Sequence, residues 1–320
     1  MRAIVRDKYG PPDVLELEEV DKPTLTDDGV LVRVRAASLN RADWYELQVS
    51  VVFRMGSGVR KPKERGMGTD FAGTVEAVGK DVTGFGPGDE VFGGRTGALA
   101  EYVCVRNAVA LKPANVTFEE AAAVPIAAIT ALQALRDKGQ IQPGQKVLIN
   151  GASGGVGTFA VQIAKAFGAE VTGVCSTRNV DNARSIGADH VIDYTKEDFT
   201  RSGELYDLML DIEGSNSWSE IRRILKPEAT LVLVGARLGK GALGALRHIF
   251  PLFLRGKAAR QKVTFFIAKL NRQDLEFLAD LMKTGKMRSV IDRSYQLSEA
   301  AEAYRYMGEG HAQGKVVINI

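Results

Sequence analysis

The stretch KVLINGASGGVG, residues 146–157, decides the fold of this chain. Its first five residues form an apolar run of the kind found in parallel strands that are buried on both faces. Glycines follow at positions 151, 154, 155 and 157, and a helical pattern begins at once. Glycine permits a tight turn and a close approach to a diphosphate, while a helix N-terminus offers free N–H groups and the positive end of its dipole. The stretch therefore predicts a dinucleotide-binding loop.

The glycine spacing is G-x-x-G-x-x-G, which departs from the usual G-x-G-x-x-G of such loops. Gly155, Gly157 and Ala160 also fit a looser form of that pattern in a shifted register. The alternative is a glycine-rich connection that binds no ligand. The position of the loop between a buried strand and a helix favours the binding loop.

The sequence after the loop alternates apolar runs with amphipathic helical segments. The apolar runs are EVTGV, HVIDY, YDLMLDIEG, TLVLVG and, as a sixth strand, VTFFI from Val263. Strands separated by helices are typical of a parallel sheet that is covered on both faces. We therefore predict an α/β fold with a doubly wound parallel sheet of the Rossmann type.

The segment before residue 115 has a different texture. Short Val-rich runs broken by glycines, such as LVRVRAASL from Leu31, indicate a compact antiparallel β domain with one inserted helix, Arg41 to Gln48. An Ala-rich helical stretch then begins with the capping-box spacing Thr117 to Glu120. The tail predicts a helix at 272–284, a strand near 289–291, a helix after residue 298 and a closing strand KVVINI.

Composition excludes several classes of protein. Of the 320 residues, 45% are apolar and 25% charged, which is typical of a globular protein and not of a disordered one. The formal net charge of +3 is too small for a general nucleic-acid-binding surface. Two cysteines, Cys104 and Cys175, are too few for a disulfide framework and form no Cys-x-x-Cys pair.

Targeting signals are not recognisable in the sequence. The N-terminal residues carry charges at Arg2, Arg6 and Asp7, where a signal peptide needs an uninterrupted apolar segment. No run approaches the ~20 apolar residues of a membrane-spanning helix. Together with the few cysteines, these features predict a cytoplasmic protein.

The second strand of the predicted sheet leads into the stretch CSTRN, residues 175–179. Sites for NAD usually carry an acidic residue here, about 20 residues after the glycines, to bind a ribose hydroxyl. This chain has no carboxylate before Asp181 and offers Ser176, Thr177 and Arg178 instead. Hydroxyls and a guanidinium suit a 2′-phosphate, so the sequence favours NADPH. The alternative is that Arg178 is a solvated loop residue.

Six motifs recur in one order along the chain: SLNRADW (38–44), GTDFAGTVEAVG (68–79), PGDEVFG (87–93), GASGGVG (151–157), GADHVIDY (187–194) and GKVVI (314–318). In these motifs the chain resembles the medium-chain dehydrogenase/reductase superfamily, specifically its zinc-independent quinone oxidoreductase-like branch. The resemblance implies a GroES-like antiparallel β catalytic domain made from residues 1–122 and 268–320. It also implies a Rossmann NADP-binding domain, residues 123–267, between them, with the cofactor in the cleft.

Zinc-dependent members of this superfamily hold a catalytic zinc with a Cys, a His and a second Cys or His. The resemblance places Asn40, Thr69 and Ile126 at those positions, and none of the three is a zinc ligand. The four-cysteine lobe of the structural zinc is absent, and Ala42 replaces the hydroxyl of the usual proton relay. We expect no zinc and negligible oxidation of simple alcohols, because nothing would stabilise the alkoxide.

An NADPH-dependent enzyme without zinc can still reduce an electron-poor acceptor, such as a quinone or an α,β-unsaturated carbonyl. It must orient the partners and stabilise negative charge on the carbonyl oxygen. The candidates are Asn40, through its amide, and Tyr45, one turn later on the same predicted helix and also a candidate proton donor. Tyr9 resembles a further aromatic residue that lines the cleft in this family. The structural alternatives are that Asn40 caps the helix, that Tyr45 only packs and that Asp43 only pairs with nearby backbone or an arginine.

The resemblance also assigns contacts with the cofactor. Tyr194 is expected beside the adenosine, Thr130 at the nicotinamide and Gly235 with Ala236 at the nicotinamide ribose. Phe265 and Phe266 are expected to cover the nicotinamide end, with sheet core as their alternative. The complete expected cofactor site is Thr130, Gly151, Ser153, Gly154, Gly155, Val156, Gly157, Ser176, Arg178, Tyr194, Gly235, Ala236, Phe265 and Phe266.

Two other functions also fit the sequence: an enoyl-thioester reductase, and a non-catalytic protein that binds NADPH or senses redox state. The basic segment Arg237–Lys262, which has no acidic residue, is expected to border the substrate entrance. Its bases around Phe250 and Phe253 suit an anionic membrane surface, but Pro251 and the short apolar run favour an amphipathic helix packed over the cleft. The VTFFI strand is a candidate edge for a homodimer.

Overall fold

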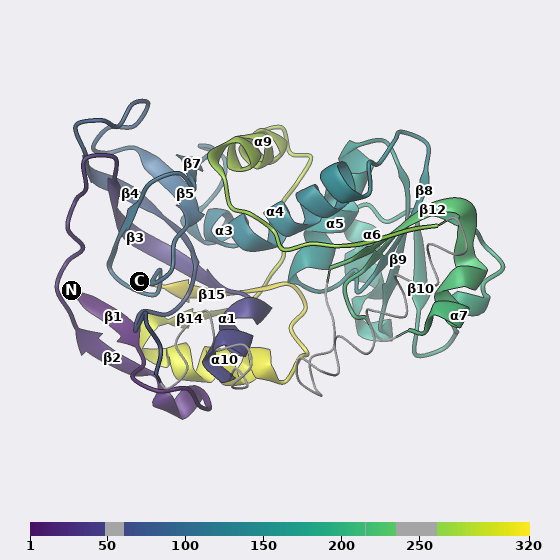
Figure 1. Cartoon of the computed structure of the whole chain (residues 1–320), viewed down its shortest axis with the longest axis horizontal. Helices are drawn as coiled ribbons and strands as arrows, with labels where there is room; N and C mark the ends of the chain where they lie inside the picture. Colours follow the sequence, from purple (N-terminus) through teal and green to yellow (C-terminus); the bar gives the residue numbers. More distant parts are fainter. Residues whose placement is uncertain (49–60, 215, 235–260) are drawn as a thin grey trace. The chain divides into compact units, whose positions relative to one another are not determined.

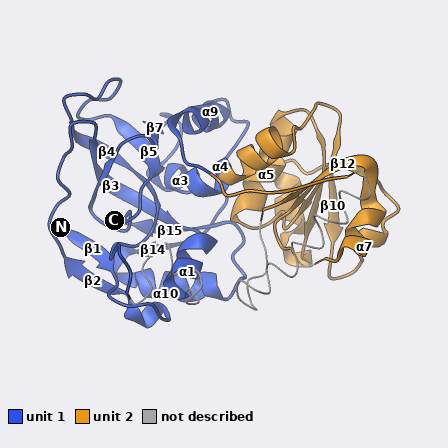
Figure 2. Cartoon of the chain, in the orientation of Figure 1, with its two compact units in different colours: residues 1–129, 269–320 blue, residues 130–268 orange. Residues whose placement is uncertain are grey.

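The computed structural model describes residues 1–48, 61–214, 216–234 and 261–320 (Figure 1). The chain divides into two compact units: unit 1 is residues 1–129 with 269–320, and unit 2 is residues 130–268 (Figure 2). The first division lies within helix α4 (Pro125–Gln133), later than the boundary expected after residue 122. The sequence carries no break signal at the division, because the Ala-rich stretch continues through it as helix. The second division lies next to the boundary expected after residue 267.

Unit 2 is built on a sheet whose described strands are all parallel and run in the order β10-β9-β8-β11-β12-β13. The strands are β8 (Lys146–Asn150), β9 (Glu170–Cys175), β10 (His190–Asp193), β11 (Tyr206–Asp211), β12 (Leu225–Leu233) and β13 (Lys262–Phe265), and the connecting helices are α5 (Gly155–Ala166), α6 (Val180–Ser185) and α7 (Trp218–Ile221). The first strand, β8, lies between β9 and β11, which confirms the doubly wound Rossmann-type sheet. The loop after β8 therefore stands where the strand order reverses, and ligands of such sheets bind there.

Unit 1 combines both ends of the chain in one sheet. Its described strands run in the order β14-β15-β3-β4-β5-β7, with β6 beside β3, and β1 and β2 form a separate antiparallel pair. The strands are β1 (Arg2–Val5), β2 (Glu16–Glu19), β3 (Val30–Leu39), β4 (Asp70–Val78), β5 (Glu90–Gly94), β6 (Tyr102–Val105), β7 (Val109–Leu111), β14 (Ile291–Gln296) and β15 (Lys315–Asn319). All described pairs in this sheet are antiparallel except β14 with β15. The expected GroES-like antiparallel domain is confirmed.

The α-helices that the structure describes in unit 1 are α1 (Arg41–Gln48), α3 (Phe118–Ala122), α9 (Arg272–Lys283) and α10 (Ala300–Gly308), with the first part of α4. The capping box before α3 is present: the Glu120 N–H donates to Thr117 Oγ1 at 3.2 Å, and the Thr117 N–H donates to Glu120 Oε2 at 2.9 Å. The strand expected near 289–291 is wrong in extent. The stretch IDRSYQ is mostly polar, and it becomes β14 because it pairs with the buried strand β15.

The apolar core of unit 1 has a part that supports α1. One buried cluster contains Leu39 at the end of β3, Leu47 on α1 and Tyr304 on α10. This packing holds α1 and the strand end before it against α10. Figure 1 shows α1, α10 and the β14–β15 pair next to one another, and α10 contacts each of them. Within the described ranges, no helix is long and apolar enough to cross a membrane.

Candidate functional site

The glycine loop after β8 has a geometry that requires glycine. Gly151 has a φ of +96°, which L side chains rarely adopt. A Cβ on Gly157 would lie 2.0 Å from the carbonyl oxygen of Gly151 and 2.8 Å from Cα of Ala152, so only glycine fits. The N–H groups of Gly151 and Ala152 both donate to the Val174 carbonyl oxygen of β9, at 3.2 and 3.0 Å. The loop is thereby anchored to the neighbouring strand.

The start of α5 suits an anionic group. Gly154 occupies the N-cap position, so no side chain of the cap residue covers the first N–H groups of the helix. These N–H groups and the helix dipole favour a phosphate in the turn. The loop residues therefore fit the diphosphate of a dinucleotide.

A buried amide joins this loop to the end of β9. Asn179 Nδ2 donates to Ser153 Oγ in the glycine loop and to Ser176 Oγ after β9, both at 3.1 Å. Both serines are predicted from the sequence, but Asn179 is not. An asparagine before a helix signals a cap, so its local sequence offered no reason to give it another role.

The side chain of Thr177, which follows β9, is turned to the end of the neighbouring strand β10. Its hydroxyl donates to Asp193 Oδ2 at 2.5 Å, and Asp193 also accepts from the N–H and the hydroxyl of Thr195 at 3.0 and 2.7 Å. The hydrogen bond from Thr177, followed by those from Thr195, lowers the pKa of Asp193 to about 2. Asp193 is therefore ionised at neutral pH and holds the Thr177 hydroxyl.

The structure describes twelve of the fourteen expected cofactor residues, all in unit 2; Gly235 and Ala236 lie outside the described residues, as do residues 237–260 of the basic segment. Arg178 and Tyr194 are exposed, Tyr194 at 60%, and Thr130 is half-buried on α4. Phe265 ends β13 with 44% exposure, and Phe266 lies just after it with Lys138 Nζ 5.9 Å from its ring centre. Phe265 is exposed and Phe266 is half-buried, so neither is a fully buried residue of the sheet core among the described residues.

Unit 1 contains a buried polar cluster, which we call the Lys315 cluster: Asn40, Asp43, Thr69, Asp70 and Lys315. Lys315 Nζ donates to Asn40 Oδ1 at 2.6 Å, to the Leu39 carbonyl oxygen at 3.0 Å and to Asp70 Oδ2 at 3.4 Å. Asn40 Nδ2 donates to the same Asp70 oxygen at 2.8 Å. Asp43 accepts from the Asn40 N–H at 2.7 Å and from the Thr69 hydroxyl at 3.1 Å.

Burial shifts the pKa values of the ionisable groups in the Lys315 cluster. Burial, with the nearby carboxylate of Asp70, raises the pKa of Asp43 to about 7. Burial also raises the pKa of Asp70 and lowers that of Lys315, while their mutual attraction opposes both shifts. The cluster therefore holds one ion pair, and Asp43 gains or loses its proton near neutral pH.

The positions that resemble zinc ligands do not suit the metal. Asn40 is already engaged by the Lys315 ammonium, and a cation at 2.6 Å disfavours a second one beside it. Ile126 contributes only its backbone N–H, which donates to Asp70 Oδ1 at 3.0 Å. In the part of the chain that the structure describes, no three His, Cys, Asp or Glu side chains gather as a metal site. The donor set of Asn40, Thr69 and Ile126 does not fit zinc.

The candidate catalytic residues all lie in unit 1 but differ in surroundings. Asn40 is buried, and its side chain binds Asp70 and Lys315 rather than capping α1. Tyr45 is half-buried on α1; its hydroxyl accepts from Arg41 Nε at 3.4 Å, and its ring meets Trp44 edge-on at 5.7 Å. Tyr9 is half-buried with the Arg6 guanidinium 5.2 Å from its ring centre. Lys315 is not predicted as a site residue from the sequence, although it lies in the GKVVI motif.

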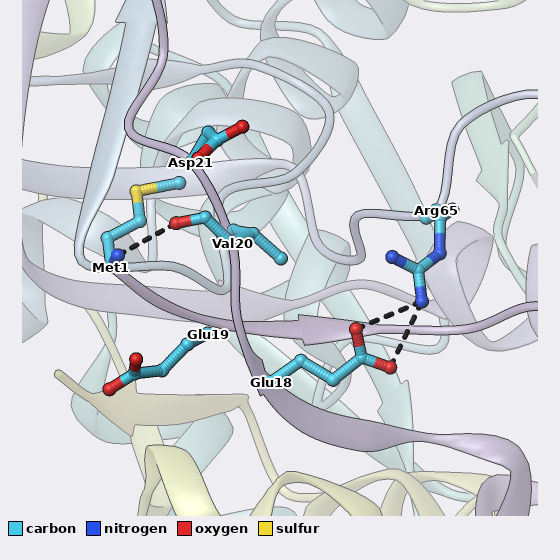
Figure 3. Close-up of a pocket in the computed structure, with 6 residues that line it drawn as sticks. All are labelled: Met1, Glu18, Glu19, Val20, Asp21 and Arg65. Atoms are coloured by element: carbon cyan, nitrogen blue, oxygen red, sulfur yellow. Dashed lines mark hydrogen bonds and ion pairs between the residues drawn. The ribbon is translucent and has the colours of Figure 1, made fainter.

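Unit 1 also has an open pocket on its surface. It is lined by Met1, Glu18, Glu19, Val20, Asp21 and Arg65 (Figure 3). Arg65 Nη2 donates to both oxygens of Glu18 at 3.0 Å, and the N-terminal ammonium donates to the Val20 carbonyl oxygen at 2.8 Å. None of the expected site residues lines it. We assign it no role in the reaction.

Comparison with known proteins gives matches over both units. Residues 26–115 match the alcohol dehydrogenase GroES-like domain, and residues 186–318 match the zinc-binding dehydrogenase family. The mouse protein called NAD(P)H oxidoreductase RTN4IP1, mitochondrial, is 35% identical over 100% of this chain and 89% of its own length. The tomato protein called 2-methylene-furan-3-one reductase is 34% identical over 100% of this chain and 79% of its own length.

Among solved structures, the quinone oxidoreductase of Coxiella burnetii superimposes with a TM-score of 0.86 at 31% identity, covering 100% of this chain and 99% of that one. The similarity therefore extends through both units.

Proposed function

Because the chain belongs to the quinone oxidoreductase-like branch of the medium-chain dehydrogenase/reductase superfamily, we propose that it transfers hydride from NADPH to a quinone or an α,β-unsaturated carbonyl without a catalytic zinc. Membership makes it an oxidoreductase with a nicotinamide cofactor and a small-molecule substrate. The choice of NADPH, the class of acceptor and the absence of zinc are the parts that we propose.

The residues of unit 2 would hold the cofactor, which supplies the hydride when bound. The N–H groups at the start of α5 and the Ser153 hydroxyl would bind the diphosphate. Ser176 and Arg178 would bind the 2′-phosphate, because no acidic residue stands at the end of β9 to bind a free ribose hydroxyl. Thr130, Tyr194, Phe265 and Phe266 remain our proposed contacts for the rest of the molecule, together with Gly235 and Ala236.

One observation supports the proposed class of hydride acceptor. The ammonium of Lys315 contacts Asn40, at a position where zinc-dependent members of the superfamily have a metal ligand. Without a Lewis acid, oxidation of a simple alcohol lacks a group to stabilise the alkoxide. A quinone or an enone is already electron-poor, so orientation and a hydrogen-bond donor near its carbonyl oxygen suffice. This argument favours electrophilic acceptors.

Tyr45 is our first candidate for that donor, with Tyr9 second. Both hydroxyl-bearing rings are only half-buried, whereas Asn40 is buried and its amide already serves Asp70. We therefore propose that Asn40 acts mainly by holding the Lys315 cluster in place below α1. Because the Tyr45 oxygen accepts from Arg41 Nε, its own O–H hydrogen stays available for a developing enolate.

Steady-state kinetics with NADPH and a panel of quinones, alkenals, enoyl thioesters and simple alcohols test this function. We expect turnover of quinones or alkenals, weak turnover of enoyl thioesters and none of alcohols. Preference for enoyl thioesters would support the second candidate, which the 35% identity to a fungal protein called trans-enoyl reductase favours. Binding of NADPH without turnover of any acceptor would indicate the non-catalytic alternative.

Metal analysis of the dialysed protein provides a separate test. We expect no stoichiometric zinc and full activity in a chelator, because the positions that resemble zinc ligands carry Asn40, Thr69 and Ile126. One zinc per chain that survives dialysis would contradict the metal-free reaction. Cytoplasmic location, homodimer formation through the β13 edge and a place for residues 237–262 at the substrate entrance stay predictions.

A further inference from the structure

The side chain of Asn179 lies between the two loops that would hold the phosphates of the cofactor. It is 4% exposed, and its Nδ2 donates to Ser153 Oγ and to Ser176 Oγ, each 3.1 Å away. Its backbone N–H donates to the Ser176 carbonyl oxygen at 2.9 Å, which fixes the turn after β9. The amide is therefore held at one place and contacts one hydroxyl from each loop.

This position is not the one that helix stability would select. Asn179 occupies the N-cap position of α6, where an asparagine oxygen usually accepts an N–H of the first turn, but no such bond is formed. Its Oδ1 is buried and finds no hydrogen-bond partner among the described residues. A buried acceptor without a partner lowers stability, and such groups concentrate where a ligand or a reaction needs them. The placement of the amide therefore points to the serines rather than to the helix.

The direction of the two hydrogen bonds has a chemical consequence. A primary amide has two N–H hydrogens, so Asn179 Nδ2 can donate one to each of the two serine oxygens that it contacts. A serine oxygen that accepts from Asn179 keeps its own O–H hydrogen for another partner. Phosphate oxygens at neutral pH are mainly acceptors, so they require donors. Both hydroxyls are thus prepared as donors before an anion arrives.

We propose that Asn179 is a positioning residue that turns the hydroxyls of Ser153 and Ser176 toward the phosphate groups of NADPH. The proposal rests on the proposed function, in which Ser153 meets the diphosphate and Ser176 the 2′-phosphate. The Thr177 hydroxyl donates to Asp193 at 2.5 Å, so it is not available as a donor to the 2′-phosphate. Recognition of the 2′-phosphate then depends on Ser176, which Asn179 orients, and on Arg178.

Two substitutions separate the donor role of Asn179 from its shape. Asn179→Leu removes both donors at similar volume, and Asn179→Asp keeps the shape but can only accept, so both serines would donate to it instead of to the ligand. Each hydrogen bond to a charged group is worth about tenfold to a hundredfold in affinity. We expect the Kd for NADPH to rise more than the Kd for NADH in both variants, because NADPH loses two oriented donors and NADH only one.

Titrations of intrinsic fluorescence with NADPH and NADH measure these constants, and Asn182→Leu, three positions later in the same segment, is the matched control. A double variant tests the route: in a Ser176→Ala background, Asn179→Leu should change the NADPH-to-NADH ratio no further. Thermal unfolding shows whether each variant is folded. If Asn179→Leu does not fold, Asn179→Asp provides the test.

The outcomes distinguish this inference from the function beneath it. If the wild type binds NADPH and NADH equally, the assignment of the 2′-phosphate site fails. If the wild type prefers NADPH and a folded Asn179 variant keeps the same ratio, the inference on Asn179 is overturned. Full additivity of Ser176→Ala and Asn179→Leu would also overturn it, because Asn179 would then act independently of the serine.

Discussion

Replacement of Lys315 by methionine should destabilise unit 1 strongly. The side chains of Lys315 and Asp70 are 2% and 0% exposed, and Lys315 Nζ contacts Asp70, Asn40 and the Leu39 carbonyl oxygen. Methionine has a similar length but no charge, so it would leave the Asp70 carboxylate buried without its cation. Removal of one partner of a buried ion pair typically costs about 3–5 kcal/mol. Ser38, Asn40 and the Ile126 N–H still donate to Asp70, so we expect the lower part of this range.

Equilibrium unfolding in urea measures this loss for each unit separately. Trp44 lies in unit 1 and Trp218 in unit 2, so variants with a single tryptophan report the two units by fluorescence. Lys315→Met should shift only the transition reported by Trp44. Lys226→Met, which breaks the half-exposed pair with Asp207 in unit 2, is the control and should cost about 1 kcal/mol or less.

The pH dependence and a partner substitution complete this test. Without the ammonium the pKa of Asp70 rises further, so the loss in Lys315→Met should grow between pH 5 and pH 8. The double variant Lys315→Met with Asp70→Asn removes the unpaired charge and should recover much of the stability. A loss below about 1 kcal/mol in the single variant, or no recovery in the double variant, would refute the account of a buried ion pair in the Lys315 cluster.

Three further predictions address the loop, the buried acid and the cofactor. Gly157→Ala would place a Cβ 2.0 Å from a carbonyl oxygen of the loop, so the affinity for NADPH should fall at least tenfold. Gly154→Ala is the control, because the nearest atom to its Cβ is 3.8 Å away, and it should fold like the wild type. Because burial raises the pKa of Asp43 from 3.8 to about 7, its protonated form adds stability below pH 4 that is lost as the pH rises through 7, by up to about 4 kcal/mol. Asp43→Asn should flatten that pH dependence in urea titrations, and an unchanged slope would contradict the shift. Arg178→Ala should weaken NADPH but not NADH in fluorescence titrations, and an equal effect on both would remove Arg178 from the 2′-phosphate site.

Several features of this protein follow from short stretches of its sequence. The glycine loop, α1 and the capping box before α3 occur where the sequence predicts them, since turn geometry and capping depend on residues a few positions apart. The parallel sheet of unit 2 was also predictable, because buried parallel strands are apolar along their whole length. The polar strand β14 was misplaced, since its pairing with β15 decides its conformation.

Only the tertiary structure showed which buried polar groups contact one another. Lys315 meets Asn40 across 275 positions of the chain and Asp70 across 245, and no local pattern encodes such contacts. The direction in which the Asn179 amide points likewise depends on a serine 26 positions earlier, on a different loop. The sequence alone determined which residue types are available, the order of the strands along the chain and a glycine loop that fits a dinucleotide. Folding decided which of those residues are buried together, and burial is what changes their charges, their hydrogen-bond directions and therefore their roles.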